Sequence, residues 1–334
     1  MADGAQNTAN VVAQPGVVVA VVGPTASGKT SLAIALAQAL GTEIVNADAR
    51  QVYRGMAIGT AQPTAEERRE AVHHLVDFLD PTELYSAGRF EDDAVPRLAT
   101  LCHERGTAIL AGGSGMYVRA ALEGLDPLPA DLAIRRSLNE ALAAKGLPAL
   151  VEQLRTLDPE HARGMDVQNP QRVVRALEVC LASGKPFSSF HNHTAKPRPW
   201  HLVRVGLRPE RSWMRARIAQ RAKTMMDQGW LEEARALSHL KDANALNTVG
   251  YKELFRHLRG ECTLERAMED LVTHTQQFAK RQLTWFQRDV GTTWFDLGQG
   301  TSHDVKNACI AHVRSEVLRL QGTPLPEATN TEHA

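Results

Sequence analysis

A complete Gly-x4-Gly-Lys-Thr phosphate loop spans residues 23–30 of this chain. In such a loop, backbone N–H groups and the N-terminus of the following helix converge on a polyphosphate. Lys29 is expected to reach the outer phosphates, and the Thr30 hydroxyl is a candidate ligand for Mg²⁺. The residues expected to contact phosphate are Gly23, Pro24, Thr25, Ala26, Ser27, Gly28, Lys29 and Thr30. A plain glycine turn is the structural alternative, and the loop alone leaves open whether phosphate is transferred, hydrolysed or released.

Two polar residues stand where other strand-like segments end. Asp48 follows the short strand-like segment 43–45 and is a candidate Mg²⁺ ligand, ribose contact or general base, or only the cap of a turn. Ser114 follows two glycines after the segment 107–111, and its hydroxyl could donate to a phosphate oxygen. A glycine-rich turn between strand and helix would explain Ser114 equally well.

Four arginines lie within the eleven residues 211–221. On a helix, Arg211 shares a face with Arg215, and Arg217 shares a face with Arg221, because each pair is four residues apart. One of these guanidinium groups could meet a diphosphate with two hydrogen bonds. For most of them, a solvated helix surface is the simpler interpretation.

The segment 278–286 alternates cationic and aromatic residues, a pattern that suits stacking and backbone contacts with RNA. Aromatic side chains of a helix belong more often to the core. We therefore expect Phe278, Trp285 and Phe286 to pack inward, which would leave Lys280 and Arg281 exposed for RNA.

Charge is distributed unevenly along the 334 residues, although the formal net charge is zero. Residues 196–290 hold 18 Lys and Arg against 11 Asp and Glu, a net charge of +7. This excess fits a local groove for a phosphate backbone, and it fits an ordinary solvated helical surface equally well. The four cysteines form no Cys-x-x-Cys pair, and no apolar run approaches a membrane span. We expect a cytoplasmic protein with reduced thiols and no membrane contact.

The elements that must position these residues alternate between strand and helix in the first part of the chain. Apolar segments at 17–22, 43–45 and 107–111 predict strands of a parallel sheet flanked by helices, and 201–207 predicts a strand that returns to this sheet. Ligands of such sheets bind at the carboxyl ends of the strands. The phosphate loop, Asp48 and Ser114 are therefore expected to surround one crevice.

The rest of the chain predicts a helical insertion within this α/β core. Helical periodicity favours helices at 132–145, 148–157 and 170–182, and the chain is expected to be mainly helical from Arg211 onward. The predicted division places the core at 15–126 and 199–320, and the insertion at 127–198. The polar segments 1–14 and 321–334 are expected to be disordered tails.

With these residues in place, the chain resembles the tRNA dimethylallyltransferases, which prenylate an adenosine beside the anticodon. The resemblance covers roughly residues 16 to 296 and rests on motifs that are jointly very specific. They stand in order at 23–30, 46–56, 58–61, 112–117 and 280–286, with support from 169–172 and 249–253.

The resemblance implies a role for several residues. It places the general base at Asp48, the hydroxyl that contacts the diphosphate at Ser114, and a phosphate-binding arginine at Arg221. It implies Mg²⁺, dimethylallyl diphosphate and the anticodon arm of tRNA as ligands of a monomer. The expected tRNA contacts are Asp48, Ala49, Arg50, Gln51, Ser114, Arg135, Gln168, Asn169, Pro170, Gln171, Arg172, Lys280 and Arg281.

Two positions depart from the usual pattern of these enzymes. Ala49 replaces the common serine, which leaves a side-chain contact there in doubt, whereas Ser114 replaces the common threonine and keeps the hydroxyl. The expected reaction transfers a dimethylallyl group to N6 of the adenosine that follows the anticodon on its 3′ side. An isopentenyltransferase that acts on free AMP, ADP or ATP is the alternative, followed by a P-loop kinase of a small metabolite and a non-catalytic RNA-binding module.

Overall fold

The computed structural model describes residues 15–190, 195–298 and 301–321. Their contacts form two compact units, one built from the residues up to Glu123 and from Pro197 onward, the other from Gly124–Lys196. The segments expected to be disordered tails lie outside the described residues, apart from Gln321.

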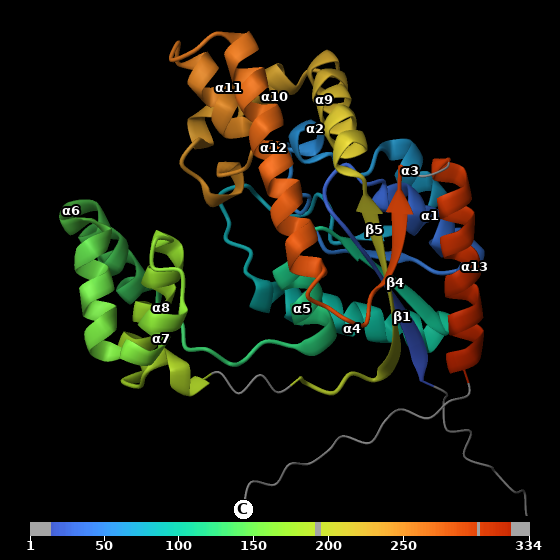
Figure 1. Cartoon of the computed structure of the whole chain (residues 1–334), viewed down its shortest axis with the longest axis horizontal. Coiled ribbons are helices and arrows are strands. Elements are labelled where there is room, and N and C mark those ends of the chain that lie inside the picture. Colours follow the sequence, from blue (N-terminus) through green and yellow to red (C-terminus); the bar gives the residue numbers. More distant parts are fainter. Residues whose placement is uncertain (1–14, 191–194, 299–300, 322–334) are drawn as a thin grey trace, which may run out of the picture. The chain divides into compact units, whose positions relative to one another are not determined.

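The larger unit is built on a six-stranded sheet with the order β3-β2-β4-β1-β5-β6, in which every pair of neighbours is parallel (Figure 1). This arrangement confirms the predicted fold class, a parallel sheet flanked by helices. The strands are β1 (Gly16–Val22), β2 (Ile44–Asn46), β3 (His73–His74), β4 (Thr107–Gly112), β5 (Trp200–Pro209) and β6 (Thr293–Leu297).

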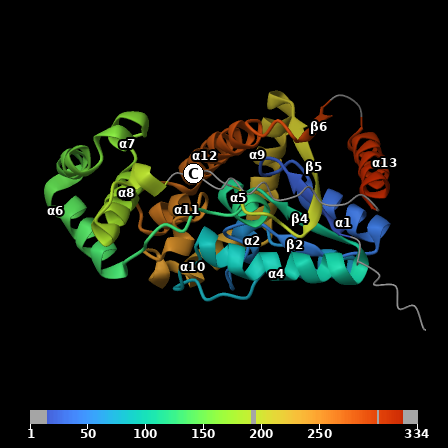
Figure 2. The same cartoon turned by 90° about the horizontal axis from the view of Figure 1, so that it is seen from below.

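The central strand β1 is buried on both faces, which explains its continuous apolar sequence. Val17, Val19 and Val21 pack against α1 (Lys29–Leu40) and α13 (Ser302–Leu320). The alternate residues of β1 pack against α4 (Ala87–Arg105) and α5 (Gly115–Glu123) on the opposite face. The two sets of helices cover the two faces of the sheet (Figure 2).

The remaining helices of this unit lie beyond the carboxyl ends of the strands or join them (Figure 1). They are α2 (Ala57–Thr60), α3 (Ala65–Glu70), α9 (Arg211–Asp227), α10 (Trp230–Ala236), α11 (Tyr251–Leu258) and α12 (Leu264–Phe286). Two short strands, β3 and β6, occur where the sequence predicted none, and β6 interrupts the part that was expected to be mainly helical. None of the helices in the described ranges is long and apolar enough to cross a lipid bilayer.

The smaller unit is helical and has its own core. It contains α6 (Leu132–Leu157), α7 (Pro159–Gly164) and α8 (Pro170–Ser183), whose apolar side chains form one cluster. Gly146 interrupts α6 with a φ of 77°, at the predicted boundary between two helices. Asn169 caps α8, Pro170 follows at the first helical position, and Gly184 ends the helix in a left-handed conformation, as the sequence predicted.

Gly112 lets two strand ends approach each other at the edge where the site lies. A Cβ atom at Gly112 would overlap the backbone of Ala47, whose amide donates to the Ala111 carbonyl at 2.8 Å. Substitution by alanine would therefore push β4 away from the segment that carries Asp48.

We predict that Gly112→Ala lowers the free energy of unfolding by about 1–3 kcal/mol, the usual range for an overpacked site. The measurement is urea-induced unfolding followed by circular dichroism. Gly88→Ala is the matched control, because the nearest heavy atom to a Cβ at Gly88 is 3.8 Å away, and alanine is favourable in a helix. Equal unfolding free energies for the two variants would contradict the close approach of Ala47.

Candidate active site

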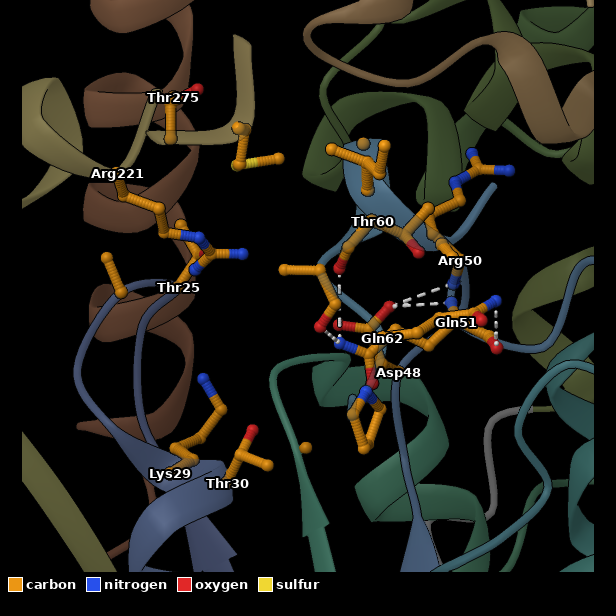
Figure 3. A pocket seen from close by; sticks show the side chains of 18 of the residues that line it. Thr25, Lys29, Thr30, Asp48, Arg50, Gln51, Thr60, Gln62, Arg221 and Thr275 are labelled. Atoms are coloured by element: carbon orange, nitrogen blue, oxygen red, sulfur yellow. Dashed lines mark hydrogen bonds between the residues drawn. The ribbon is translucent and has the colours of Figure 1, made fainter. Parts of the chain in front are cut away.

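A cavity of about 1270 Å³ lies in the larger unit, at the carboxyl ends of β1, β2 and β4. Its lining includes Lys29, Asp48 and Ser114, so the structure confirms that these residues surround one crevice. Figure 3 shows Lys29, Thr25 and Arg221 on one wall of the cavity and Asp48 on the wall across from them. The cavity therefore has a cationic wall that faces a carboxylate.

The phosphate loop is shaped by residues in the left-handed region. Gly28 has a φ of 90°, and Ala26, which is not a glycine, has a φ of 64°. The loop ends at α1, so the helix N-terminus points its amides toward the cavity. Of the eight loop residues, five line the cavity; Gly23, Pro24 and Ser27 do not. Ser27 faces a separate small cavity of about 120 Å³ behind the loop.

Lys29 is a cation of the cavity whose pKa is lowered by its surroundings. Its ammonium group donates to the Pro24 carbonyl oxygen at 2.7 Å. Burial lowers the pKa of Lys29 to about 8, although the Asp48 carboxylate raises it and the Arg221 guanidinium lowers it further. A group with this pKa is charged at neutral pH and gains from an anionic ligand.

Two of the four clustered arginines reach the phosphate loop from α9. Arg217 donates to the Ala26 carbonyl oxygen at 2.9 Å, and Arg221 donates to the Thr25 hydroxyl at 3.3 Å. Burial lowers the pKa of Arg221, and the nearby Asp48 carboxylate opposes this shift. Arg211 and Arg215 are exposed, in agreement with the solvated surface expected for most of the cluster.

Asp48 uses one carboxylate oxygen to cap the turn that follows it. This oxygen, Oδ1, accepts from the amides of Arg50 at 2.8 Å and Gln51 at 3.4 Å. Within the described part of the chain, Oδ2 takes no hydrogen bond from another residue. The structure thus contains the capping role that the sequence offered as an alternative, and it leaves the second oxygen available to a ligand.

Ser114 and Ala49 are joined through the main chain. The Ala49 amide donates to the Ser114 hydroxyl oxygen at 2.9 Å, so the missing side-chain hydroxyl at position 49 does not prevent this contact. Because the Ser114 oxygen accepts from Ala49, its own O–H proton is available to a ligand. Ser114 therefore can donate to a diphosphate oxygen while it holds the residue next to Asp48.

The other residues expected at this site are fixed by the surrounding backbone. The Gln51 amide nitrogen donates to the carbonyl oxygens of Thr60 at 3.1 Å and Ala61 at 2.7 Å. The Arg50 guanidinium donates to the Asn244 carbonyl oxygen at 2.8 Å. Both side chains line the cavity, as does Thr30.

The remaining expected RNA contacts of the larger unit lie on α12. Lys280 and Arg281 are exposed, as predicted, and Phe286 is buried. The prediction for Phe278 was wrong, because its side chain is 40% exposed at the cavity with the Arg281 guanidinium 6.0 Å from its ring centre. Trp285 is half-buried.

Gln282 is a site residue that the sequence analysis missed. Its amide oxygen accepts from the Thr25 amide at 2.8 Å, and its amide nitrogen donates to the Gly113 carbonyl oxygen at 2.8 Å. A signal existed in the sequence, because Gln282 falls in helical register with Ala279 and Phe286, the buried residues of this part of α12. A glutamine in such an apolar stripe indicates a specific polar partner.

The expected tRNA contacts of the smaller unit have structural partners or are exposed. The guanidinium of Arg135 donates twice to the buried carboxylate of Glu178, at 3.0 and 2.6 Å, and Arg175 donates to the same oxygen at 2.8 Å. Asn169 caps its helix, whereas Gln168, Gln171 and Arg172 are exposed. A role of these residues in tRNA binding stays a prediction.

Comparison with known proteins assigns this arrangement to a family. The IPP transferase family model matches residues 51–289. A tRNA dimethylallyltransferase of Christiangramia forsetii is 44% identical over 284 residues, which are 85% of this chain and 94% of that protein. The tRNA dimethylallyltransferase 2 of Parabacteroides distasonis is 38% identical over 301 residues, 90% of this chain and 99% of that protein.

A solved structure shares the fold along nearly the whole chain. It is the full-length tRNA isopentenylpyrophosphate transferase of Bacillus halodurans, with a TM-score of 0.68 and 35% sequence identity. The similarity covers 91% of this chain and 98% of that chain.

The low pKa of Lys29 predicts that pyrophosphate binding weakens above pH 8. An anion favours the protonated lysine, so the affinity falls as the free protein loses this proton, by about tenfold between pH 7 and pH 9 if only the charged form binds. The measurement is calorimetric titration with magnesium pyrophosphate at several pH values. Lys29→Arg is the control, because arginine stays charged and the variant reports only the titration of the ligand. A wild-type to variant affinity ratio that is flat across this range would contradict the prediction.

Proposed function

The chain belongs to the IPP transferase family, and from this premise we propose that it transfers a dimethylallyl group from dimethylallyl diphosphate to N6 of a tRNA adenosine. The target is the adenosine that follows the anticodon on its 3′ side, and the products are N6-(dimethylallyl)adenosine and diphosphate. The observation that carries the proposal is the cavity in which Lys29 and Arg221 face the Asp48 carboxylate.

The cationic wall binds the diphosphate and stabilises it as it leaves. The bond between C1 of the allyl group and the diphosphate oxygen breaks, and its electron pair departs with the diphosphate. Lys29, Arg221 and the amides at the start of α1 face the charge that develops on this group. Fixed donors of this kind, away from bulk water, are effective at stabilising a transition state. Ser114 adds a hydroxyl donor from the opposite loop.

The carboxylate wall receives the nucleophile. The N6 amine of adenine is a weak nucleophile because its lone pair is delocalised into the ring. As the N6–C1 bond forms, a proton leaves N6, and we assign its acceptance to Oδ2 of Asp48, the carboxylate oxygen that does not cap the turn. The adenosine must leave its base stack to enter the cavity, at a cost of about a few kcal/mol. Lys280, Arg281 and the helical unit are the proposed contacts for the surrounding RNA.

A magnesium ion fits the donor set of this site. In the described ranges, no three His, Cys, Asp or Glu side chains come together as a metal site. Mg²⁺ commonly binds through few protein ligands together with substrate phosphates and water. The Thr30 hydroxyl, which lines the cavity beside Lys29, would hold it. Its contribution would be to neutralise charge on the diphosphate.

We further propose that the enzyme acts as a monomer in the cytoplasm. The cysteines at 102, 180, 262 and 309 form no disulfides, which suits a reducing compartment.

The acceptor is tested by incubating the purified protein with radiolabelled dimethylallyl diphosphate, Mg²⁺ and either unmodified tRNA or AMP. We expect label in tRNA, at the adenosine beside the anticodon, and none in AMP. Label in AMP alone would replace this proposal with an adenylate isopentenyltransferase. Loss of the γ-phosphate from ATP in a parallel incubation, without prenyl transfer, would instead indicate a kinase.

The Asp48→Asn variant distinguishes the proposed role of Asp48 as a general base from its role as the cap of the turn. Asparagine keeps an oxygen that can accept from the Arg50 and Gln51 amides, but it cannot take a proton from N6. We expect the transfer rate to fall by about 10²–10⁴-fold, the usual contribution of a general base, while tRNA affinity stays within about twofold. Single-turnover kinetics and filter binding measure the two quantities. A wild-type rate would reduce Asp48 to a capping residue.

A further inference from the structure

Gln282 connects two loops of the cavity that are remote from each other in the sequence. Its side-chain amide is used at both ends, by the Thr25 amide on the phosphate loop and by the Gly113 carbonyl oxygen next to Ser114, each at 2.8 Å. The residue is 7% exposed, so these hydrogen bonds are made away from bulk water. Each end of the amide is matched to its partner, because Oε1 only accepts and Nε2 only donates.

The hydrogen bonds continue from Gly113 to the carboxylate wall. Ser114, which follows Gly113, donates its amide to the Ala47 carbonyl oxygen at 3.2 Å and accepts from the Ala49 amide at 2.9 Å. These two alanines flank Asp48 in the sequence. Gln282 thus stands in a continuous series of contacts that joins the phosphate loop to the segment that holds the proposed base.

We propose that Gln282 is a positioning residue that fixes the separation between the departing diphosphate and the accepting carboxylate. The inference rests on the proposed function, because that reaction needs the leaving oxygen, C1 and N6 aligned between the two walls. An error of about 1 Å in such an alignment can lower a rate by about 100-fold. A purely structural glutamine would affect folding stability and the active fraction of the protein, but would not set the rate of each active molecule.

The absence of a side chain at Gly113 is what allows the Gln282 amide to approach this loop. A Cβ atom at Gly113 would overlap the Gln282 amide nitrogen and would lie 3.6 Å from the Lys29 ammonium nitrogen. Glycine at this position is therefore what lets the Gln282 amide reach the loop beside the cation that faces the diphosphate.

Gln282→Glu replaces the matched amide by a carboxylate. The ionised carboxylate only accepts hydrogen bonds, so it can keep the Thr25 amide as a donor but opposes the Gly113 carbonyl oxygen. The Lys29 and Arg221 cations that line the same cavity favour this ionised form, so the mismatch is present at neutral pH. We expect the transfer rate constant of this variant at pH 7.5 to be about 100-fold below that of the wild type, with active molecules counted by active-site titration. A wild-type rate constant would overturn the proposal.

Gln282→Leu removes both hydrogen bonds and is compared with Gln277→Leu, the same change at an exposed position of α12 outside the cavity lining. We expect kcat of Gln282→Leu to fall by about 100-fold, with the KM for tRNA within about twofold, and we expect wild-type kinetics for the control. Active-site titration corrects both variants for misfolded protein. A corrected kcat of Gln282→Leu equal to that of the wild type would also overturn the proposal.

A pyrophosphate-binding measurement tests the role of Gln282 independently of the proposed prenyl transfer. We expect Gln282→Leu to bind magnesium pyrophosphate about tenfold more weakly than the wild type. The Thr25 amide would lose its hydrogen-bond acceptor, and the phosphate loop would no longer be held in its position. If the wild type transferred no prenyl group to either acceptor, the proposed function would fail, yet this comparison would still test whether Gln282 orders the phosphate loop. Equal pyrophosphate affinities of the wild type and Gln282→Leu would then contradict a role of Gln282 in ordering the phosphate loop.

Discussion

Buried positive charge at the end of β1 is the constraint on which the rest of the site depends. An ammonium or guanidinium group removed from water is unfavourable unless its donors and its charge are compensated. Lys29 donates to the Pro24 carbonyl oxygen and Arg221 to the Thr25 hydroxyl, both on the phosphate loop, and the Asp48 carboxylate supplies part of the opposite charge. Burial still lowers the pKa of Lys29 and of Arg221, so the compensation is incomplete. An anionic ligand would complete it, which supports the proposed diphosphate site.

The order of the strands explains how segments that are distant in the sequence come together around these cations. β1 lies between β4 and β5, so the loops that follow these three strands open at one edge of the sheet. β4 leads to Ser114, and β2, its other neighbour, leads to Asp48. β5 leads within two residues to α9, which carries Arg217 and Arg221 to the phosphate loop. The parallel topology therefore accounts for all of these contacts, and α12 adds Gln282 between two of the loops.

Much of this arrangement could be predicted because its signals are local. An apolar β-branched sequence forms β1, and a glycine-rich sequence forms the loop that follows it. In the same way, Asn169 and Pro170 start α8 and Gly184 ends it. Each of these signals determines the conformation of the backbone next to it. What the sequence did not predict depends on partners far along the chain. β3 and β6 are short edge strands that exist through their neighbours, and the roles of Gln282 and Arg135 follow from Thr25, Gly113 and Glu178, which no local pattern connects to them. Phe278 was assigned to the core because helical aromatics usually are buried, but its face of α12 borders a cavity.

The lining of the cavity bears on what the phosphate loop holds. A loop of this type usually serves nucleoside triphosphates, and a carboxylate opposite the phosphates would suit a kinase as well as a prenyltransferase. Phosphoryl transfer, however, needs little apolar surface around the transferred group. The lining of the cavity also includes the apolar side chains of Ile58, Ile218, Met225 and Leu271. Apolar side chains beside a diphosphate site favour a ligand with a hydrocarbon chain. This lining supports the proposed transfer of an allylic carbon chain, with the diphosphate as the proposed leaving group.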